Sequence, residues 1–162
     1  MWIDGVLVGG MASEPDRIAL ARAYRDAAGY LIDSALASGE PWRLSYPIFY
    51  LYRHALELYL KAALPQPRPV HDLQPLIGQF AELLRRRIGV DIAADVRDDL
   101  LAFAAIDPDA QGFRYTDTTR GERRVLPGEY WVSLRDLQRL MEEVFLGVEE
   151  ALRRPTPTVW TV

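Results

Sequence analysis

The segment SYPIFYLYRHALELYLKAAL, residues 45–64, constrains the fold more than any other part of the chain. At about 100° per residue, its apolar side chains cover most of the circumference of a helix. The side opposite His54 carries Ile48, Phe49, Tyr52, Leu56, Tyr59, Leu60 and Ala63. A helix that is apolar almost all round is buried by other helices. The segment therefore predicts the central helix of a bundle, beginning at Trp42 or Ser45 and ending at Leu64.

Apolar residues at helical spacing predict four further helices, each with its own start and stop signals. The first covers about 18–36, with Ser13 as its N-cap. The third covers 72–88, between a capping Asp72 and a terminating Gly89. The fourth covers 91–106, and the last begins at Ser133, which forms an approximate capping box with Asp136 and is followed by an apolar stripe as far as Leu152.

These elements predict one domain over residues 1–162, because a chain of this length buries a single core. We expect an all-α, up-and-down bundle of about five helices, with residues 1–12 as an N-terminal arm and 155–162 as an extended tail. The short connection PQPRP, residues 65–69, predicts that the helices on either side are antiparallel neighbours. His71 would then lie beside the end of the central helix.

A long segment, GFRYTDTTRGERRVLPGEYWV at 112–132, precedes the last helix and predicts a loop or an irregular hairpin. A loop of this length inside a compact domain is more often functional or mobile than idle. It combines arginines with aromatic residues: Arg114, Arg120, Arg123 and Arg124 with Phe113, Tyr115, Tyr130 and Trp131. This combination suits phosphate contact plus base stacking, and it is equally typical of a solvated hairpin.

A narrow polar stripe runs along the central helix through Tyr50, His54, Glu57 and Lys61. Lys61 is the chain's one lysine, against 18 arginines, and His54 is one of its two histidines. Two interpretations stay open. Glu57 and Lys61 form an ordinary surface ion pair on a wet edge, or the stripe is a partly desolvated seam in which charges must be paired or used. The other histidine, His71, is a further candidate or simply braces the turn beside Asp72.

Composition excludes several classes of site. The chain has no cysteine, so it forms neither a disulfide nor a thiolate metal site, and two histidines argue against structural zinc. We predict no metal and no cofactor, since no phosphate-binding glycine loop or hydrolase motif is present. A net charge of −4 creates no general attraction for nucleic acid. No run of about 18 apolar residues predicts a membrane span, and without a leader we expect a cytoplasmic protein.

With these residues identified, the chain resembles the HEPN domain superfamily. The resemblance rests on YRHALELYLKAAL (52–64), HDLQPLI (71–77) and GFRY (112–115), in that order. It implies a four- or five-helix bundle that often forms a homodimer. Family roles range from metal-independent ribonuclease toxins in defence and toxin–antitoxin systems to non-catalytic binding of nucleotide or RNA. The ribonuclease members carry an arginine four to six residues before a histidine, whereas here Arg53 abuts His54 and Arg68 is three before His71.

The expected function is therefore non-catalytic binding of a nucleotide or RNA phosphate, with a homodimer and a cognate antitoxin or nucleotidyltransferase protein as partners. No catalytic residue is assigned. The alternative is an atypical metal-independent endoribonuclease, in which His54 or His71 acts as general acid or base and Lys61 or Arg114 stabilises the phosphorane. A second alternative is a structural protein-interaction partner. The expected ligand-binding residues are Tyr50, His54, Glu57, Lys61, His71, Arg114 and Tyr115.

Overall fold

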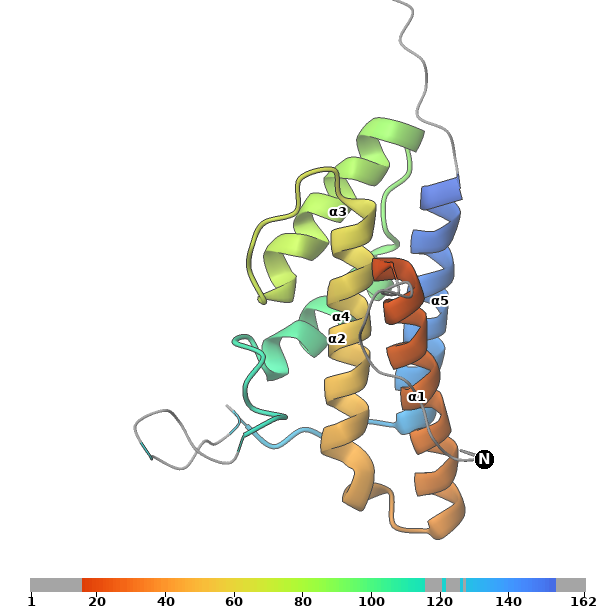
Figure 1. Ribbon diagram of the computed structural model, residues 1–162, viewed down its shortest axis with the longest axis vertical. Coiled ribbons are helices and arrows are strands. Elements are labelled where there is room, and N and C mark those ends of the chain that lie inside the picture. Colours follow the sequence, from red (N-terminus) through yellow and green to blue (C-terminus); the bar gives the residue numbers. More distant parts are fainter. Residues whose placement is uncertain (1–15, 116–120, 122–125, 127, 154–162) are drawn as a thin grey trace, which may run out of the picture.

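The computed structural model describes residues 16–115, 121, 126 and 128–153, and every regular element in those residues is helical (Figure 1). The helices are α1 (Arg17–Ser38), the 3₁₀ turn η1 (Pro41–Leu44), α2 (Ser45–Ala63), α3 (Leu73–Ile88), α4 (Ala94–Ile106) and α5 (Leu134–Arg153). This confirms the predicted all-α bundle of five helices. The expected arm at 1–12, the tail at 155–162, and Ser13, Arg120, Arg123 and Arg124 lie outside the described residues.

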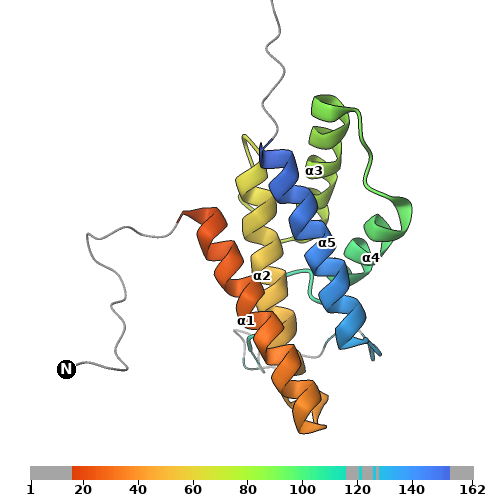
Figure 2. The same cartoon turned by 90° about the vertical axis from the view of Figure 1, so that its right-hand side faces the viewer.

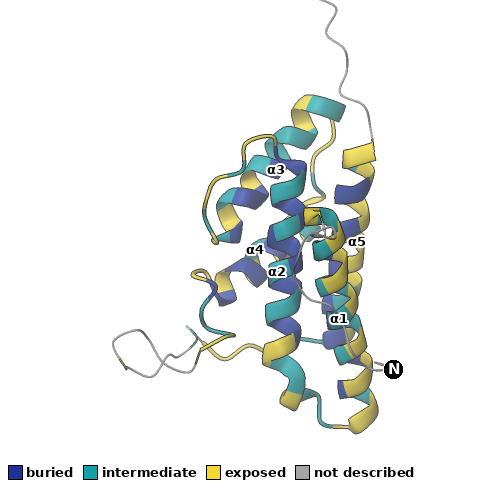
Figure 3. Ribbon diagram, viewed as in Figure 1, coloured by how far each residue is buried: buried dark blue, intermediate teal, exposed yellow. Residues whose placement is uncertain are grey.

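Helix α2 is the centre of the bundle, as its sequence predicted. It packs against α1, α3 and α5, and Figures 1 and 2 show it between α1 and α3. Figure 3 shows that buried residues follow its length. All seven apolar residues expected on its inner side are buried. Within this core the ring of Tyr59 stacks on Phe145 of α5, with centroids 4.7 Å apart.

The ends of α3 follow local signals in the sequence. The carboxylate of Asp72 accepts a hydrogen bond from the backbone N–H of Gln74 at 3.0 Å, which satisfies one of the free donors of the first turn. Gly89 ends the helix with a φ of 68°, a conformation that glycine adopts without strain. Both predicted caps of this helix are confirmed.

Two helix starts differ from the predicted ones. The N-cap of α1 is Asp16, which accepts from the N–H of Ala19 at 2.7 Å, so the capping role expected of Ser13 was wrong. Helix α4 begins at Ala94, three residues after the expected Asp91. The carboxylate of Asp91 instead pairs with the guanidinium of Arg85 at 2.7 Å, which holds it outside the helix.

The start of α5 keeps half of the predicted capping box. The Ser133 hydroxyl accepts from the N–H of Asp136 at 3.3 Å, as expected. The carboxylate of Asp136, which would complete the box by reaching back, pairs with Arg139 one turn further along the helix. The helix therefore starts where the sequence predicted, with a simpler cap.

The direction of α3 was predicted wrongly. Ile88 at its end lines the same small cavity as Ala63 at the end of α2, while His71 just before it lies beside Glu57. Helices α2 and α3 therefore run in the same direction, and the connection between them returns along α2 before α3 begins (Figure 1). As a consequence, His71 contacts the middle of α2 instead of its end.

An ion-pair cluster fastens α5 to the first two helices. Oε1 of Glu149 accepts from the Arg22 guanidinium at 2.9 Å and from the Tyr59 hydroxyl at 2.8 Å. Burial raises the pKa of Tyr59 to about 12, and its bond to Glu149 acts in the same direction. The hydroxyl therefore stays protonated and remains a donor to the carboxylate at neutral pH.

Candidate functional site

The polar stripe of α2 is a partly buried seam. Glu57 is only 5 % exposed, so the interpretation of Glu57 and Lys61 as an ordinary surface pair was wrong. Lys61 and His54 are partly buried, and Tyr50 lies one turn before His54 on the same helix. Burying a carboxylate is unfavourable unless cations or donors compensate it. The next question is therefore what surrounds Glu57.

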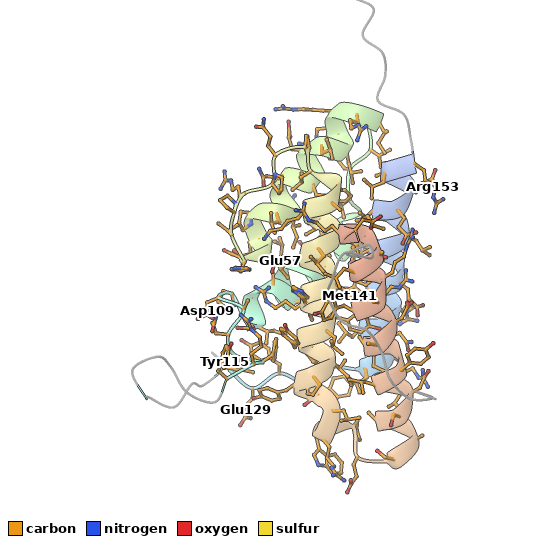
Figure 4. The ribbon with its side chains drawn as sticks, in the orientation of Figure 1. Glu57, Asp109, Tyr115, Glu129, Met141 and Arg153 are labelled. Carbon is orange, nitrogen blue, oxygen red and sulfur yellow. The ribbon has the colours of Figure 1, made fainter. Side chains whose placement is uncertain are left out.

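Three basic side chains surround the Glu57 carboxylate. Nζ of Lys61 donates to Oε1 at 2.7 Å, and Nδ1 of His71 lies 3.0 Å from the same oxygen. A guanidinium nitrogen of Arg53 lies 3.7 Å from Oε2. Lys61 and His71 come from different segments of the chain, and the same carboxylate oxygen holds both. Glu57, near the middle of the molecule in Figure 4, thus brings together two of the predicted site residues.

Arg53 is a residue that sequence reasoning missed. It is 3 % exposed, and its guanidinium donates to the backbone carbonyl oxygens of Asp107 at 3.0 Å and His71 at 2.8 Å. Burial lowers the pKa of Arg53, and the carboxylates of Asp107 and Glu57 oppose that change. The spacing of four residues between Arg53 and Glu57 was the available signal. Because its N–H donors point to the backbone carbonyls of Asp107 and His71, Arg53 holds these two segments of the chain in place.

Asp107 completes this buried cluster from the end of α4. Its Oδ1 accepts from the backbone N–H groups of Gln111 at 3.0 Å and Gly112 at 2.8 Å. Its Oδ2 lies 3.9 Å from Nε of Arg53, and it is buried without a hydrogen-bond partner in the described part of the chain. Asp107 therefore shapes the turn that leads directly to Arg114 and Tyr115.

His54 lies between aromatic rings. The edge of Tyr24 from α1 meets it with centroids 4.5 Å apart, and the ring of Tyr50 is parallel to it at 5.9 Å. Burial is the largest cause that lowers the pKa of His54, and Arg114, His71 and Lys61 lower it further, while Glu57 opposes them. Because this pKa falls below its ordinary value of 6.5, the imidazole is neutral at pH 7.

Arg114 lies between two tyrosines at the end of the seam away from Lys61. Its guanidinium carbon is 5.7 Å from the ring centroid of Tyr50 and 5.4 Å from that of Tyr115, within cation–π range. Its Nε donates to the carbonyl of Ala110 at 2.7 Å, which fixes the direction of the side chain. The terminal nitrogens make no further hydrogen bond to the described residues.

The structure thus places all seven predicted site residues along one face of α2, with Arg114 and Lys61 at opposite ends. Arg114 does not contact Lys61, but both act on the pKa of His54. Between the described residues no hydrogen bond joins the two histidines, and His71 remains largely exposed. No group of three histidine, aspartate or glutamate side chains that could hold a metal ion occurs in the described residues. We call the row formed by these seven predicted site residues the α2 face.

Comparisons with protein-family models, with curated proteins and with solved structures found no match to this chain. Within the residues that the structure describes, no helix is both long and apolar enough to cross a membrane.

Proposed function

We propose that the α2 face binds a phosphate-bearing ligand, a nucleotide or a short stretch of single-stranded RNA, without catalysis. The observation that carries this proposal is the guanidinium of Arg114, which lies over the rings of both Tyr50 and Tyr115. An oriented guanidinium recognises phosphate oxygens through paired N–H donors. A partly exposed tyrosine beside it offers a surface on which a base stacks. Lys61 supplies a second positive charge at the other end of the face.

The family resemblance forms part of this proposal. Its three sequence pieces are widely spaced in the chain, yet they meet around one buried centre: Arg53 and Glu57 from α2, His71 before α3, and the segment after α4 that carries Arg114. This convergence supports assigning the chain to the HEPN superfamily as a non-catalytic member. A homodimer and a partner protein from a toxin–antitoxin or defence module belong to the same proposal.

A ribonuclease activity is the second candidate, favoured by the neutral imidazole of His54, whose pKa Arg114 and Lys61 both lower. Arg53 argues against it, because this arginine, which precedes His54 and donates to the backbone carbonyl of His71, is buried and cannot contact a phosphate. Arg114 would have to stabilise the phosphorane in its place, but no histidine follows it at a spacing of four to six residues. The proposal therefore favours binding over cleavage.

The test is fluorescence anisotropy with a labelled single-stranded RNA of about ten nucleotides, with ATP and AMP as competitors, at low salt and with EDTA. We expect Arg114→Ala to weaken binding about tenfold, equivalent to about 1.4 kcal/mol, and to lower the salt dependence by about one charge. Lys61→Gln keeps a donor for Glu57 and removes the charge, so it should weaken binding by a smaller factor. Arg86→Ala, which removes an exposed arginine of α3, is the matched control.

Three outcomes would each contradict a part of the proposal. If Arg86→Ala weakens binding as much as Arg114→Ala does, the interaction is general electrostatic attraction and the α2 face is not the site. If the same RNA is cleaved in EDTA and His54→Ala abolishes cleavage, the ribonuclease candidate replaces the binding one. A light-scattering mass of a single chain would remove the homodimer.

A further inference from the structure

A cavity lies at the end of the bundle where η1, the start of α2 and the segment before α5 meet. The cavity has a volume of about 610 Å³, a size typical of small-ligand pockets. Its floor includes buried apolar side chains of three different helices: Phe49, Ile106 and Leu134. The cavity is therefore built on the rigid core, and it shares no residue with the α2 face.

Aromatic side chains form the walls of this cavity. Phe113 packs edge-on against Tyr46, with centroids 5.6 Å apart, and tilts against Phe49 at 5.3 Å. Tyr46 and Tyr130 are about half exposed, while Trp42 is 66 % and Trp131 is 91 % exposed. A tryptophan that is almost fully in water loses the burial that normally favours so large an apolar side chain. Several large aromatic side chains that line one cavity and remain exposed to solvent indicate a binding site.

The described residues that line this cavity carry a negative charge. Glu129 is the ionisable acid among its lining residues, and the described lining contains no arginine, lysine or histidine. Glu129 is exposed and makes no hydrogen bond or ion pair within the described part of the chain. Figure 4 shows it on the segment that leads to α5, at the same side of the molecule as Tyr115. Among the described residues of the lining, an anionic ligand would find no cation, and Glu129 would repel it.

We propose that this aromatic pocket binds an organic cation, an alkylated ammonium group, with Glu129 as its counter-ion. The faces of tryptophan and tyrosine rings carry negative electrostatic potential and attract such cations within about 6 Å of the ring centre. Methyl groups on the nitrogen leave the positive charge in place and weaken its hydration, so an alkylated ammonium group can also pack on the apolar floor. This site is independent of the phosphate site on the α2 face, and it uses neither Arg114 nor Lys61.

The test is an NMR titration with choline and, separately, with 3,3-dimethylbutan-1-ol, a neutral alcohol of nearly the same shape. The chain has four tryptophans, and Trp42→Phe and Trp131→Phe identify the two indole N–H signals of the pocket. We expect choline to shift these two signals saturably. The neutral alcohol should bind at least tenfold more weakly, because it lacks the charge on which the cation–π term depends.

Variants separate the charge from the aromatic surface. Glu129→Gln should weaken choline binding about fivefold and leave the alcohol unchanged, while Trp131→Ala should weaken choline about tenfold. Both positions are exposed, so the variants should fold normally, which the dispersion of the amide spectrum checks. Tyr30→Ala removes an exposed aromatic side chain of α1 remote from the pocket and is the matched control.

Three results would overturn the proposal. Equal affinities for choline and the alcohol would make the pocket a purely apolar site. If choline gives no saturable shift up to about 100 mM, the pocket is not a cation site. A partner protein would then be its occupant. An unchanged choline affinity in Glu129→Gln would remove Glu129 as counter-ion. None of these results bears on RNA binding at the α2 face.

Discussion

Replacing Glu149 by glutamine tests how strongly one carboxylate fastens the bundle. Its Oε1 accepts hydrogen bonds from Arg22 of α1 and from the Tyr59 hydroxyl of α2. The bond from Arg22 is the largest cause that lowers the pKa of Glu149 from 4.5 to about 2, while burial acts in the opposite direction. Glu149→Gln keeps the shape of the side chain and removes the charge, so it isolates the ionic contribution.

The size of the effect follows from the change in pKa. A decrease from 4.5 to about 2 corresponds to about 3 kcal/mol of stabilisation at neutral pH, at about 1.4 kcal/mol per pH unit. The Arg22 side chain is half exposed, and solvent screening reduces this value, so we expect Glu149→Gln to lose about 2 kcal/mol at pH 7. Because the folded pKa is depressed, the stabilisation is complete above about pH 4.5 and is lost as the pH falls toward 2.

The assay is urea unfolding followed by circular dichroism at several pH values between 7 and 3. The difference in unfolding free energy between wild type and Glu149→Gln should shrink to less than half of its neutral value by about pH 3. Glu150→Gln is the matched control, because Glu150 pairs with Arg153 on the exposed side of α5 and should change stability by under about 0.5 kcal/mol. A Glu149→Gln difference that is the same at pH 7 and pH 3 would refute the ionic explanation.

Three further predictions concern the buried cluster, the histidine and the backbone. Arg53→Lys should lower the free energy of unfolding by about 3 kcal/mol in chemical denaturation. One ammonium group cannot replace a guanidinium that donates to the backbone carbonyls of both Asp107 and His71. A loss below about 1 kcal/mol would contradict this role. The ring of His54 should titrate with a midpoint below 6.5 in NMR. As the pH falls from 6.5 to that midpoint, the folded state should lose stability, because the unfolded chain binds more protons in this range. A midpoint above 6.5 would show that burial does not dominate the pKa of His54. Gly89→Ala should destabilise the protein by about 1 kcal/mol in thermal unfolding, because Gly89 has a positive φ. Gly78 lies in α3 with open space around it, so Gly78→Ala should stabilise the protein by a similar amount. Equal effects of the two substitutions would refute the conformational explanation.

The parts of the fold that were predictable from the sequence depend on local chemistry. Asp72 and Gly89 cap and end α3 through bonds to neighbouring residues, and the apolar circumference of α2 by itself determines its central place. The direction of α3 was not predictable in this way. The length of the connection after α2 fixes only that the helices are neighbours, whereas the bonds of Arg53 and Glu57 to the segment at His71 fix its path.

The site shows the same division between local and tertiary information. Tyr50, His54, Glu57 and Lys61 share a face because helical spacing requires it. The burial of Glu57 depends on the packing of a distant segment and was beyond the reach of periodicity. Arg53 was missed for a related reason: its spacing to Glu57 was visible, but its hydrogen-bond acceptors are backbone carbonyl groups, which no sequence pattern marks.

The bonds of Arg53 also determine how the α2 face would respond to a ligand. One guanidinium holds the connection that carries His71 and the turn that leads to Arg114, so both segments are ordered by the core before any ligand arrives. Preorganised receptors lose little conformational entropy on binding. Association at this face should therefore proceed without a slow conformational step, and differences in affinity between related ligands should lie in their rates of dissociation.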